Sequence, residues 1–176
     1  MADESRFQSV ITDEMRAKIG VEGEPQTHEV TTTGVRMFAR AVGYDDPVYY
    51  DREVARAQGY RDLPAPPGFL GAPIFDPRES DPTFGVRRSS GPGVRSPYKL
   101  VLNGGTDVEY FDEGICAGDV LTARSKLDSL TERYSAALGG PMLIQVTATT
   151  YKNQDGKVVA VVRGTGISYG PKRDDT

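Results

Sequence analysis

The chain has 176 residues, 38% of them hydrophobic and 26% charged, with a formal net charge of −4, which is typical of one soluble globular domain. The acidic balance argues against a nucleic-acid partner, and no apolar run is long enough to span a bilayer. Residues 1–8 are polar, which argues against a signal peptide, so we expect a cytoplasmic location. One cysteine, Cys116, and one histidine, His28, exclude an internal disulfide, a thiolate metal site and a metal site built from several histidines.

The N-terminal part of the chain has patterns typical of short helices and one strand. The predicted elements are a helix at 12–19, a strand at 26–32, and helices at 35–42 and 51–57. Thr12 and Asp51 are the expected N-caps, because their side-chain oxygens can accept hydrogen bonds from the first free amides of a helix. Gly20, Gly43 and Gly59 are the expected C-terminal stops.

An irregular stretch and then long strands follow. Residues 63–97 are rich in proline, glycine and arginine; only 69–75 is apolar enough to pack as a short helix or strand, and 76–97 lacks periodicity, as functional or disordered loops do. The predicted strands are 100–111, 120–130, 143–152 and 157–168. Residues 153–156, Asn-Gln-Asp-Gly, are typical of a hairpin loop between the last two strands. The charged residues 171–176 are expected to fray.

This order of elements predicts an α+β domain in which a curved antiparallel sheet wraps a helix. We divide the chain into an N-terminal helical segment at 1–20, a single domain at 21–170 that includes an irregular loop at 76–98, and a charged tail at 171–176. Because a curved sheet covers only one face with its own helices, pairing with a second subunit is expected.

Two segments in the first half of the chain resemble a known family. Residues 38–51 read Phe-Ala-Arg-Ala-Val-Gly-Tyr-Asp-Asp-Pro-Val-Tyr-Tyr-Asp, and residues 63–69 read Leu-Pro-Ala-Pro-Pro-Gly-Phe. Together they resemble the signature of the MaoC-like dehydratases: a helix, Gly-Asp-x-Asn-Pro-x-His-x-Asp, an alanine-bearing helix and a short glycine or proline turn. The second segment is similar to the N-terminal branch of that group, which departs from this signature, and to the acyl-chain-binding subunits of (3R)-hydroxyacyl-carrier-protein dehydratases.

A second patch agrees with this resemblance. Residues 104–106, Gly-Gly-Thr, enter one strand, and residues 118–121, Gly-Asp-Val-Leu, open the next, like the family's Gly-Gly strand and Gly-Asp-x-Leu turn. The resemblance implies a hot-dog fold, in which a strongly curved antiparallel sheet wraps a long central helix. It also implies that two such units pair and hold an acyl thioester in a tunnel between them.

The family's catalytic aspartate and histidine correspond, when aligned on Pro47, to Tyr44 and Tyr49. An unperturbed phenol titrates at about 10, so neither tyrosine is a good base near neutral pH, and the catalytic pair is lost. Both tyrosines are instead expected to bind substrate as walls of the acyl tunnel. Asp45 and Asp46 remain as candidate catalytic bases, if burial raises a carboxyl pKa. Their other interpretation is structural, since aspartate before proline is common in turns.

Further candidate substrate-binding residues lie in the turn and in the irregular loop. In the family, the turn that matches Pro67, Gly68 and Phe69 aims backbone N–H groups at the thioester carbonyl, although these residues could simply form a rigid turn. Arg87 and Arg88 lie in the irregular loop, where guanidinium groups suit the phosphates of coenzyme A or of a carrier protein's phosphopantetheine. A solvated loop is the alternative.

The remaining reactive side chains carry no function in this interpretation. His28 lies on a predicted outer strand and is interpreted as a surface residue. Cys116 lies in a turn without an adjacent base or cation in the sequence, so a nucleophilic role is not expected. We expect no metal and no cofactor, apart from the coenzyme A or phosphopantetheine that belongs to the substrate.

The leading hypothesis is a subunit of an (R)-specific enoyl-thioester hydratase or 3-hydroxyacyl-thioester dehydratase, which binds the acyl chain while a MaoC-like partner supplies the aspartate and histidine. Three alternatives stay open, since fold alone does not decide between them: a self-sufficient homodimeric hydratase that uses Asp45 or Asp46, a hot-dog thioesterase, and an acyl-thioester-binding protein without activity. The assembly is expected to be a homodimer, or a heterodimer with a catalytic MaoC-like subunit. The acyl group, and the choice between coenzyme A and a carrier protein, stay open.

Overall fold

The computed structural model of the chain describes residues 7–74, 93–111 and 114–172. Its helices are α1 (Asp13–Ala17), α2 (Thr32–Ala41), the 3₁₀ helix η1 (Pro47–Tyr49) and α3 (Arg52–Ala57). Its strands are β1 (Gln26–Glu29), β2 (Ala72–Pro73), β3 (Tyr98–Tyr110), β4 (Val120–Ser135), β5 (Gly140–Lys152) and β6 (Val158–Lys172). Most of the predicted irregular loop, including Arg87 and Arg88, lies outside the described residues, as does the end of the predicted tail.

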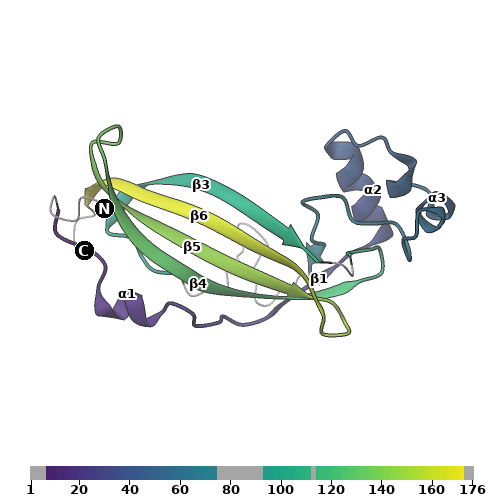
Figure 1. Cartoon of the computed structure of the whole chain (residues 1–176), viewed down its shortest axis with the longest axis horizontal. Coiled ribbons are helices and arrows are strands. Elements are labelled where there is room, and N and C mark those ends of the chain that lie inside the picture. The colour runs from purple at the N-terminus through teal and green to yellow at the C-terminus, as the bar shows by residue number, and fades with distance from the viewer. Residues whose placement is uncertain (1–6, 75–92, 112–113, 173–176) are drawn as a thin grey trace.

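The strands form one six-stranded antiparallel sheet in the order β2-β1-β4-β5-β6-β3. Figure 1 shows that β3, β4, β5 and β6 run side by side as long strands and that the sheet curls along its length. The α+β class and the four predicted long strands are therefore confirmed. The segment predicted at 69–75 as a short helix or strand contributes the two-residue strand β2.

The predicted caps and the predicted hairpin are formed by the expected residues. Thr12 accepts a hydrogen bond from the amide three residues further on, at 3.2 Å, at the start of α1. Asp51 accepts one from the Glu53 amide, at 2.7 Å, at the start of α3. The loop between β5 and β6 is closed by a hydrogen bond of 2.9 Å from the Asn153 amide to the Lys157 carbonyl. These local signals were sufficient because each depends on residues close together in the sequence.

The boundary between β1 and α2 differs from the prediction. The strand predicted to reach residue 32 ends at Glu29, and α2 begins at Thr32. Thr31 has an extended backbone but serves as the N-cap, accepting a hydrogen bond from the Gly34 amide at 3.0 Å. The β-branched threonines are typical of a strand, yet here they start a helix, because a capping hydroxyl competes with strand pairing for this backbone.

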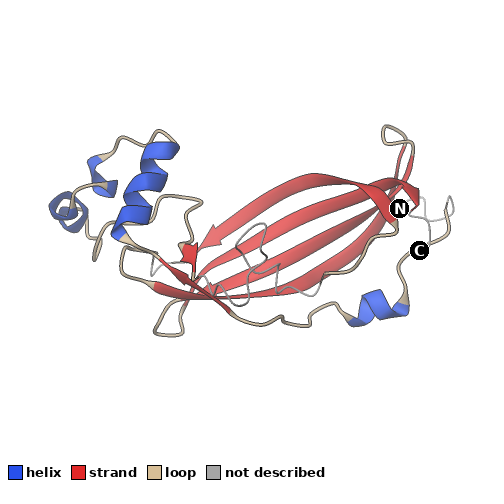
Figure 2. Ribbon diagram, turned by 180° about the vertical axis from the view of Figure 1, so that it is seen from behind, coloured by secondary structure: helices blue, strands red, loops and turns tan. Residues whose placement is uncertain are grey.

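The helices gather at the two ends of the sheet. Figure 2 shows α2 and α3 together beyond one end, and α1 beside the other end, on the opposite side of the molecule. We call the part that contains α2, η1 and α3 the helical end. Across residues 7–74, 93–111 and 114–172, no helix is long and apolar enough to cross a membrane.

Two separate hydrophobic clusters hold these ends on the sheet. The cluster at the helical end consists of Val30, Val35, Val48, Ala55, Leu63, Ile115, Ala117, Leu121, Val159 and Ala160. The cluster near α1 consists of Val94, Tyr98, Leu127, Leu130 and Leu143. Because the first cluster joins α2, η1, α3 and the segment after α3 to β4 and β6, it fixes the position of the turn that matches the family's binding turn.

Candidate functional site

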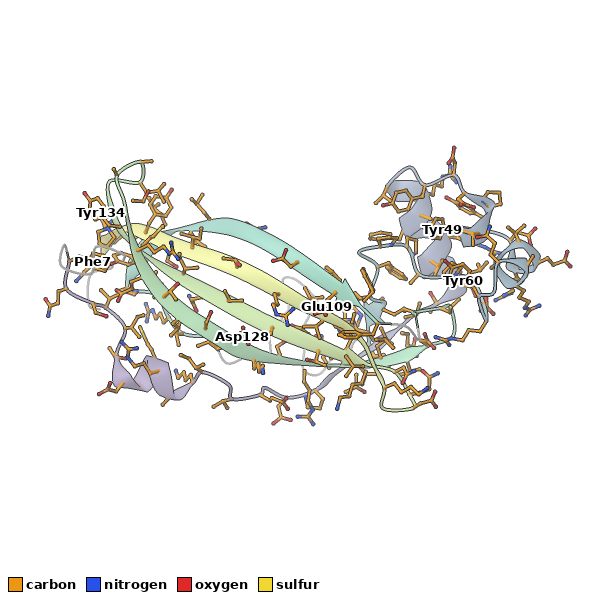
Figure 3. The ribbon with its side chains drawn as sticks, in the orientation of Figure 1. Phe7, Tyr49, Tyr60, Glu109, Asp128 and Tyr134 are labelled. Carbon is orange, nitrogen blue, oxygen red and sulfur yellow. The ribbon has the colours of Figure 1, made fainter. Side chains whose placement is uncertain are left out.

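Tyr44 and Tyr49, which match the family's catalytic positions, meet at the helical end. Tyr44 follows α2, and Tyr49 ends η1. Their rings stack with centroids 5.7 Å apart and planes 23° apart. Tyr44 is 40% exposed, whereas Tyr49 is half-buried against the cluster at the helical end. The structure therefore brings the two positions together as an aromatic surface, and Figure 3 shows Tyr49 and Tyr60 in this region.

The chemistry of Tyr49 does not suit proton abstraction. Burial raises the pKa of its phenol, and the neighbouring Tyr44, Asp46 and Tyr60 raise it further. A phenol with a raised pKa is protonated near neutral pH, so it cannot act as a general base there. The two positions therefore present stacked rings, and a role for them as walls of the acyl tunnel stays a prediction.

The two candidate carboxylates have different surroundings. The Asp46 side chain accepts a hydrogen bond of 2.9 Å from the Val48 amide and caps η1, which is the structural role considered for it. Asp45 is exposed, and among the described residues its carboxylate has no hydrogen-bond or ion-pair partner. A catalytic role for either one stays a prediction.

The turn at residues 66–69 has a defined geometry. Gly68 has a φ of +91°, in the left-handed region that glycine adopts without strain. The Phe69 amide donates to the Pro66 carbonyl at 2.9 Å, which closes the turn. The Phe69 ring packs on Phe38, with centroids 5.3 Å apart. Pro66 is buried whereas Pro67 and Gly68 are exposed, so the turn presents Gly68 at the surface.

The Gly68 amide has a partner that the sequence did not indicate. Its N–H donates a hydrogen bond of 2.6 Å to the hydroxyl oxygen of Tyr110, at the end of β3. The two residues are 42 positions apart, and no motif links them. The expected donor to a thioester carbonyl therefore lies beside a tyrosine hydroxyl that sequence reasoning missed.

A buried carboxylate anchors the loop beside this turn. The Asp119 side chain is completely buried and forms a two-pronged ion pair with Arg61. It also accepts hydrogen bonds from the Cys116 amide at 2.9 Å and the Gln154 side chain at 3.2 Å. Burial on its own would raise the pKa of Asp119, but the hydrogen bonds from Arg61, Cys116 and Gln154 outweigh it and hold the pKa below its usual value. The Gly-Asp motif was visible in the sequence, but its partner Arg61 was not.

The anchored loop is joined directly to the segment that leads into the turn. The Ala65 amide donates to the Ile115 carbonyl at 2.7 Å, and the Ala117 amide donates to the Leu63 carbonyl at 2.8 Å. The Asp119 network therefore positions residues 63–65, and through them the Gly68 turn, relative to the sheet.

The interpretation of His28 as a surface residue is wrong. β1 lies inside the sheet between β2 and β4, and both ring nitrogens of His28 are shielded from solvent without a hydrogen-bond partner among the described residues. The ring meets Tyr151 edge-on, with centroids 5.5 Å apart. Burial lowers the pKa of the imidazole. The nearby backbone of Gly71 and Leu70 partly opposes that shift. His28 is thus a neutral residue under the segment that follows the turn.

Cys116 is 3% exposed, and burial raises the pKa of its thiol, although Arg61 acts in the opposite direction. A buried, protonated thiol is a poor nucleophile, in agreement with the sequence interpretation. Within the part of the chain that the structure describes, no three His, Cys, Asp or Glu side chains gather to hold a metal ion. Arg87 and Arg88 lie outside the described residues, so their role in phosphate binding stays a prediction.

Comparisons with known proteins agree on one family. A family model described as FAS1-like, dehydratase domain region matches residues 17–162. The chain is 30% identical over 162 residues to a protein of Thermomonospora curvata named "Probable enoyl-CoA hydratase alpha subunit", with 87% of this chain and 50% of that protein covered. It is 31% identical over 140 residues to a UPF0336 protein of Streptomyces avermitilis, with 77% of this chain and 81% of that protein covered. The chain thus spans half the length of the first of these relatives.

Solved structures support the same fold. The chain superposes on a chain of the ChsH1-ChsH2 complex from Mycobacterium tuberculosis with a TM-score of 0.71 and 18% identity, covering 89% of this chain and 93% of that one. For the HadBC (3R-hydroxyacyl-ACP dehydratase) complex from the same organism, the TM-score is 0.58, the identity 23%, and the coverage 86% and 99%. These identities show the fold alone. The chain therefore belongs to the family described as FAS1-like, dehydratase domain region, and has the hot-dog fold of the MaoC-like dehydratases.

Proposed function

We propose that the chain is the acyl-binding subunit of an (R)-specific enoyl-thioester hydratase or 3-hydroxyacyl-thioester dehydratase, and that a partner chain supplies the catalytic aspartate and histidine. The observation that carries the proposal is the stacked pair Tyr44 and Tyr49 at the positions of the family's catalytic pair. A family member that keeps the binding turn but fills the catalytic positions with tyrosine retains a surface for the acyl group and lacks its own acid and base.

The chemistry divides naturally between two chains. Hydration adds the oxygen of water to the β carbon of the enoyl thioester and a proton to the α carbon, while negative charge develops on the thioester oxygen. An acid and a base must move the protons, and hydrogen-bond donors must stabilise that oxygen. The partner would supply the first two groups. This chain would supply apolar walls at Tyr44, Tyr49 and Phe69, together with the backbone donor of Gly68.

The surface of β3 supports a partner at this chain's sheet edge. β3 is a terminal strand of the sheet, and all of its residues except Tyr98 are exposed. Its exposed large apolar residues, together with the one that follows the strand, are Leu100, Val101, Leu102, Val108, Tyr110 and Phe111. Among the described residues, no strand pairs with the outer edge of β3, and an exposed, apolar edge strand is a site for pairing with another chain. We place the second hot-dog subunit on this edge.

The names of similar proteins also support a two-subunit arrangement. One relative is named an alpha subunit, and the two similar structures are complexes of two named components. These names describe those proteins; for this chain they make a MaoC-like chain the preferred partner over a second copy.

The test compares rates of hydration of crotonyl-coenzyme A by three samples: this chain, a MaoC-like chain that contains Asp-x-Asn-Pro-x-His, and their co-purified complex. General acid–base groups typically contribute about 10²–10⁴-fold, so this chain alone should be slower than the complex by a factor in that range. Release of free coenzyme A thiol is measured in the same samples. Turnover by this chain alone at the rate of the complex would overturn the two-subunit proposal, and thiol release would favour a thioesterase.

The second candidate is a self-sufficient hydratase, and the observation that favours it is the exposed Asp45 carboxylate, which has no partner in the described part of the chain. If the chain alone turns over, Asp45→Asn should abolish that activity and Asp46→Asn should not, because Asp46 is committed to the Val48 amide. Equal loss in both variants would point to the turn as a whole rather than to one base.

The phosphate end of the substrate is assigned to Arg87 and Arg88. The proposal rests on the match of guanidinium groups to phosphate oxygens. The double variant Arg87→Ala/Arg88→Ala should bind a coenzyme A thioester more weakly, and added salt should weaken binding by the wild-type chain in the same way. Unchanged affinity would show that these arginines are simply solvated.

A further inference from the structure

The Gly68 amide is the one outward backbone donor of its turn. Residues 66 and 67 are prolines and have no N–H group. The amides of Ala65 and Phe69 donate to main-chain carbonyls within the fold, at 2.7 Å and 2.9 Å. The Gly68 N–H therefore remains for an acceptor outside the segment, and the Tyr110 hydroxyl takes it at 2.6 Å.

This contact is not required to satisfy a buried group. Gly68 is exposed and Tyr110 is 42% exposed, so water could serve both partners. A hydrogen bond between exposed groups makes a modest net contribution to stability, about a 2- to 10-fold preference for the closed contact, since water replaces it when it breaks. The hydrogen bond can therefore be broken at a modest cost in free energy. It matters because of the position that the phenol oxygen occupies.

The donor is held in a turn that packs within the fold, whereas the acceptor is on an exposed side chain. The turn is fixed by the packing of Phe69 on Phe38 and by the backbone hydrogen bonds to the loop that Asp119 anchors. Tyr110 lies at the end of β3 and is 42% exposed, and exposed side chains in general change rotamer on the picosecond to nanosecond timescale. An incoming acceptor can thus displace the hydroxyl without moving the turn.

We propose that, in the unliganded chain, the Tyr110 hydroxyl occupies the position at Gly68 that the carbonyl oxygen of an acyl thioester takes, and that substrate binding exchanges one oxygen for the other. The inference rests on the proposed function, since it takes an acyl thioester as the ligand. Tyr110 then acts as a gate. Its hydroxyl accepts the Gly68 hydrogen bond while the site is empty, and this contact lowers the affinity for substrate.

The experiment follows the Gly68 amide by ¹⁵N NMR in the wild-type chain, in Tyr110→Phe and in the control Tyr134→Phe. Tyr134 is a comparably exposed tyrosine, 44% exposed, at the opposite end of the sheet (Figure 3). Because phenylalanine keeps the ring, an upfield shift of the unliganded Gly68 amide proton in Tyr110→Phe alone reports the loss of the hydrogen bond. Each protein is then titrated with crotonyl-N-acetylcysteamine, a small acyl thioester without a nucleotide.

The gate predicts that Tyr110→Phe binds the thioester about 2- to 10-fold more tightly than the wild-type chain, the factor that corresponds to one competing hydrogen bond. Tyr134→Phe should match the wild-type chain. Equal affinity in Tyr110→Phe, or an unshifted unliganded Gly68 amide, would overturn the gate, and weaker binding would make the hydroxyl a direct contact to substrate instead. If no amide of the folded wild-type chain or of Tyr110→Phe responds to the thioester, the proposed function fails, and the gate fails with it.

Discussion

The rings of Tyr44 and Tyr49 lie 5.7 Å apart and nearly parallel, so the positions that carry an acid and a base in the family form an aromatic stack in this chain. Stacked aromatic pairs contribute through buried area and ring electrostatics, neither of which needs the hydroxyl groups. The role of the pair should therefore depend on the rings and not on the phenol protons.

Tyr49→Phe should leave both the free energy of unfolding and the hydration rate of the two-chain complex nearly unchanged. Tyr49→Ala should destabilise the chain by about 1–3 kcal/mol, because it removes a ring that packs against the cluster at the helical end. Urea unfolding and the crotonyl-coenzyme A assay measure the two effects. A tenfold slower reaction in Tyr49→Phe, with stability unchanged, would give the phenol a chemical role.

Asp119→Asn should lower the free energy of unfolding by about 1–3 kcal/mol, because it weakens the bonds to Arg61 and Cys116 at a completely buried carboxylate. The matched control is Glu109→Gln, which removes the exposed pair with Arg163 at 3.3 Å and should cost less than about 1 kcal/mol. Similar losses in urea unfolding for both variants would mean that burial of Asp119 does not matter. The amides of residues 63–65 should also exchange faster with solvent in Asp119→Asn.

The stability of the chain should fall as the pH drops from 7.5 to 5, and His28 is the reason. Burial lowers the pKa of its imidazole below 6.5, so the unfolded chain binds a proton at a pH where the folded chain does not. The free energy of unfolding therefore increases with pH between the lowered pKa of the folded state and the pKa of the unfolded state. Below the lowered pKa, His28 no longer makes it depend on pH. The pKa values of Asp62 and Asp119 are lowered from 3.8, so their contributions are lost at more acidic pH.

His28→Phe keeps a planar ring against Tyr151 and removes the titration. Its free energy of unfolding, measured by urea at several pH values, should change less between pH 7.5 and 5 than that of the wild-type chain. An identical pH dependence in both proteins would show that the imidazole is not the group responsible.

Val101→Lys should weaken subunit pairing without unfolding the chain. Val101 is 64% exposed on β3, and a lysine there disfavours strand pairing with a partner, because pairing would bury its charge. Val21→Lys is the control, since Val21 is 51% exposed and lies outside the strands. Light scattering after size-exclusion chromatography, alone and with the MaoC-like chain, should show weaker assembly for Val101→Lys only. If both variants still assemble with the partner, the partner binds another surface.

The sequence by itself determined the features that depend on neighbouring residues and on motif order. The caps at Thr12 and Asp51, the hairpin at residues 153–156, the long strands and the tyrosines at positions 44 and 49 all follow from local hydrogen bonding, alternation and alignment with one family. Each of these signals lies within a few residues of the feature that it predicts, so no knowledge of the tertiary packing was needed.

Only the tertiary structure decided which surfaces are covered and which distant groups meet. Alternation in β1 showed that it has two faces, but not that residues 70–71 would cover His28. The contact between Gly68 and Tyr110, and the pairing of Arg61 with Asp119, depend on how the segment after α3 packs against the end of the sheet. Contacts of that kind form between residues 42 and 58 positions apart, and their geometry depends on strand order and register, which a single sequence encodes only through the packing of the whole chain.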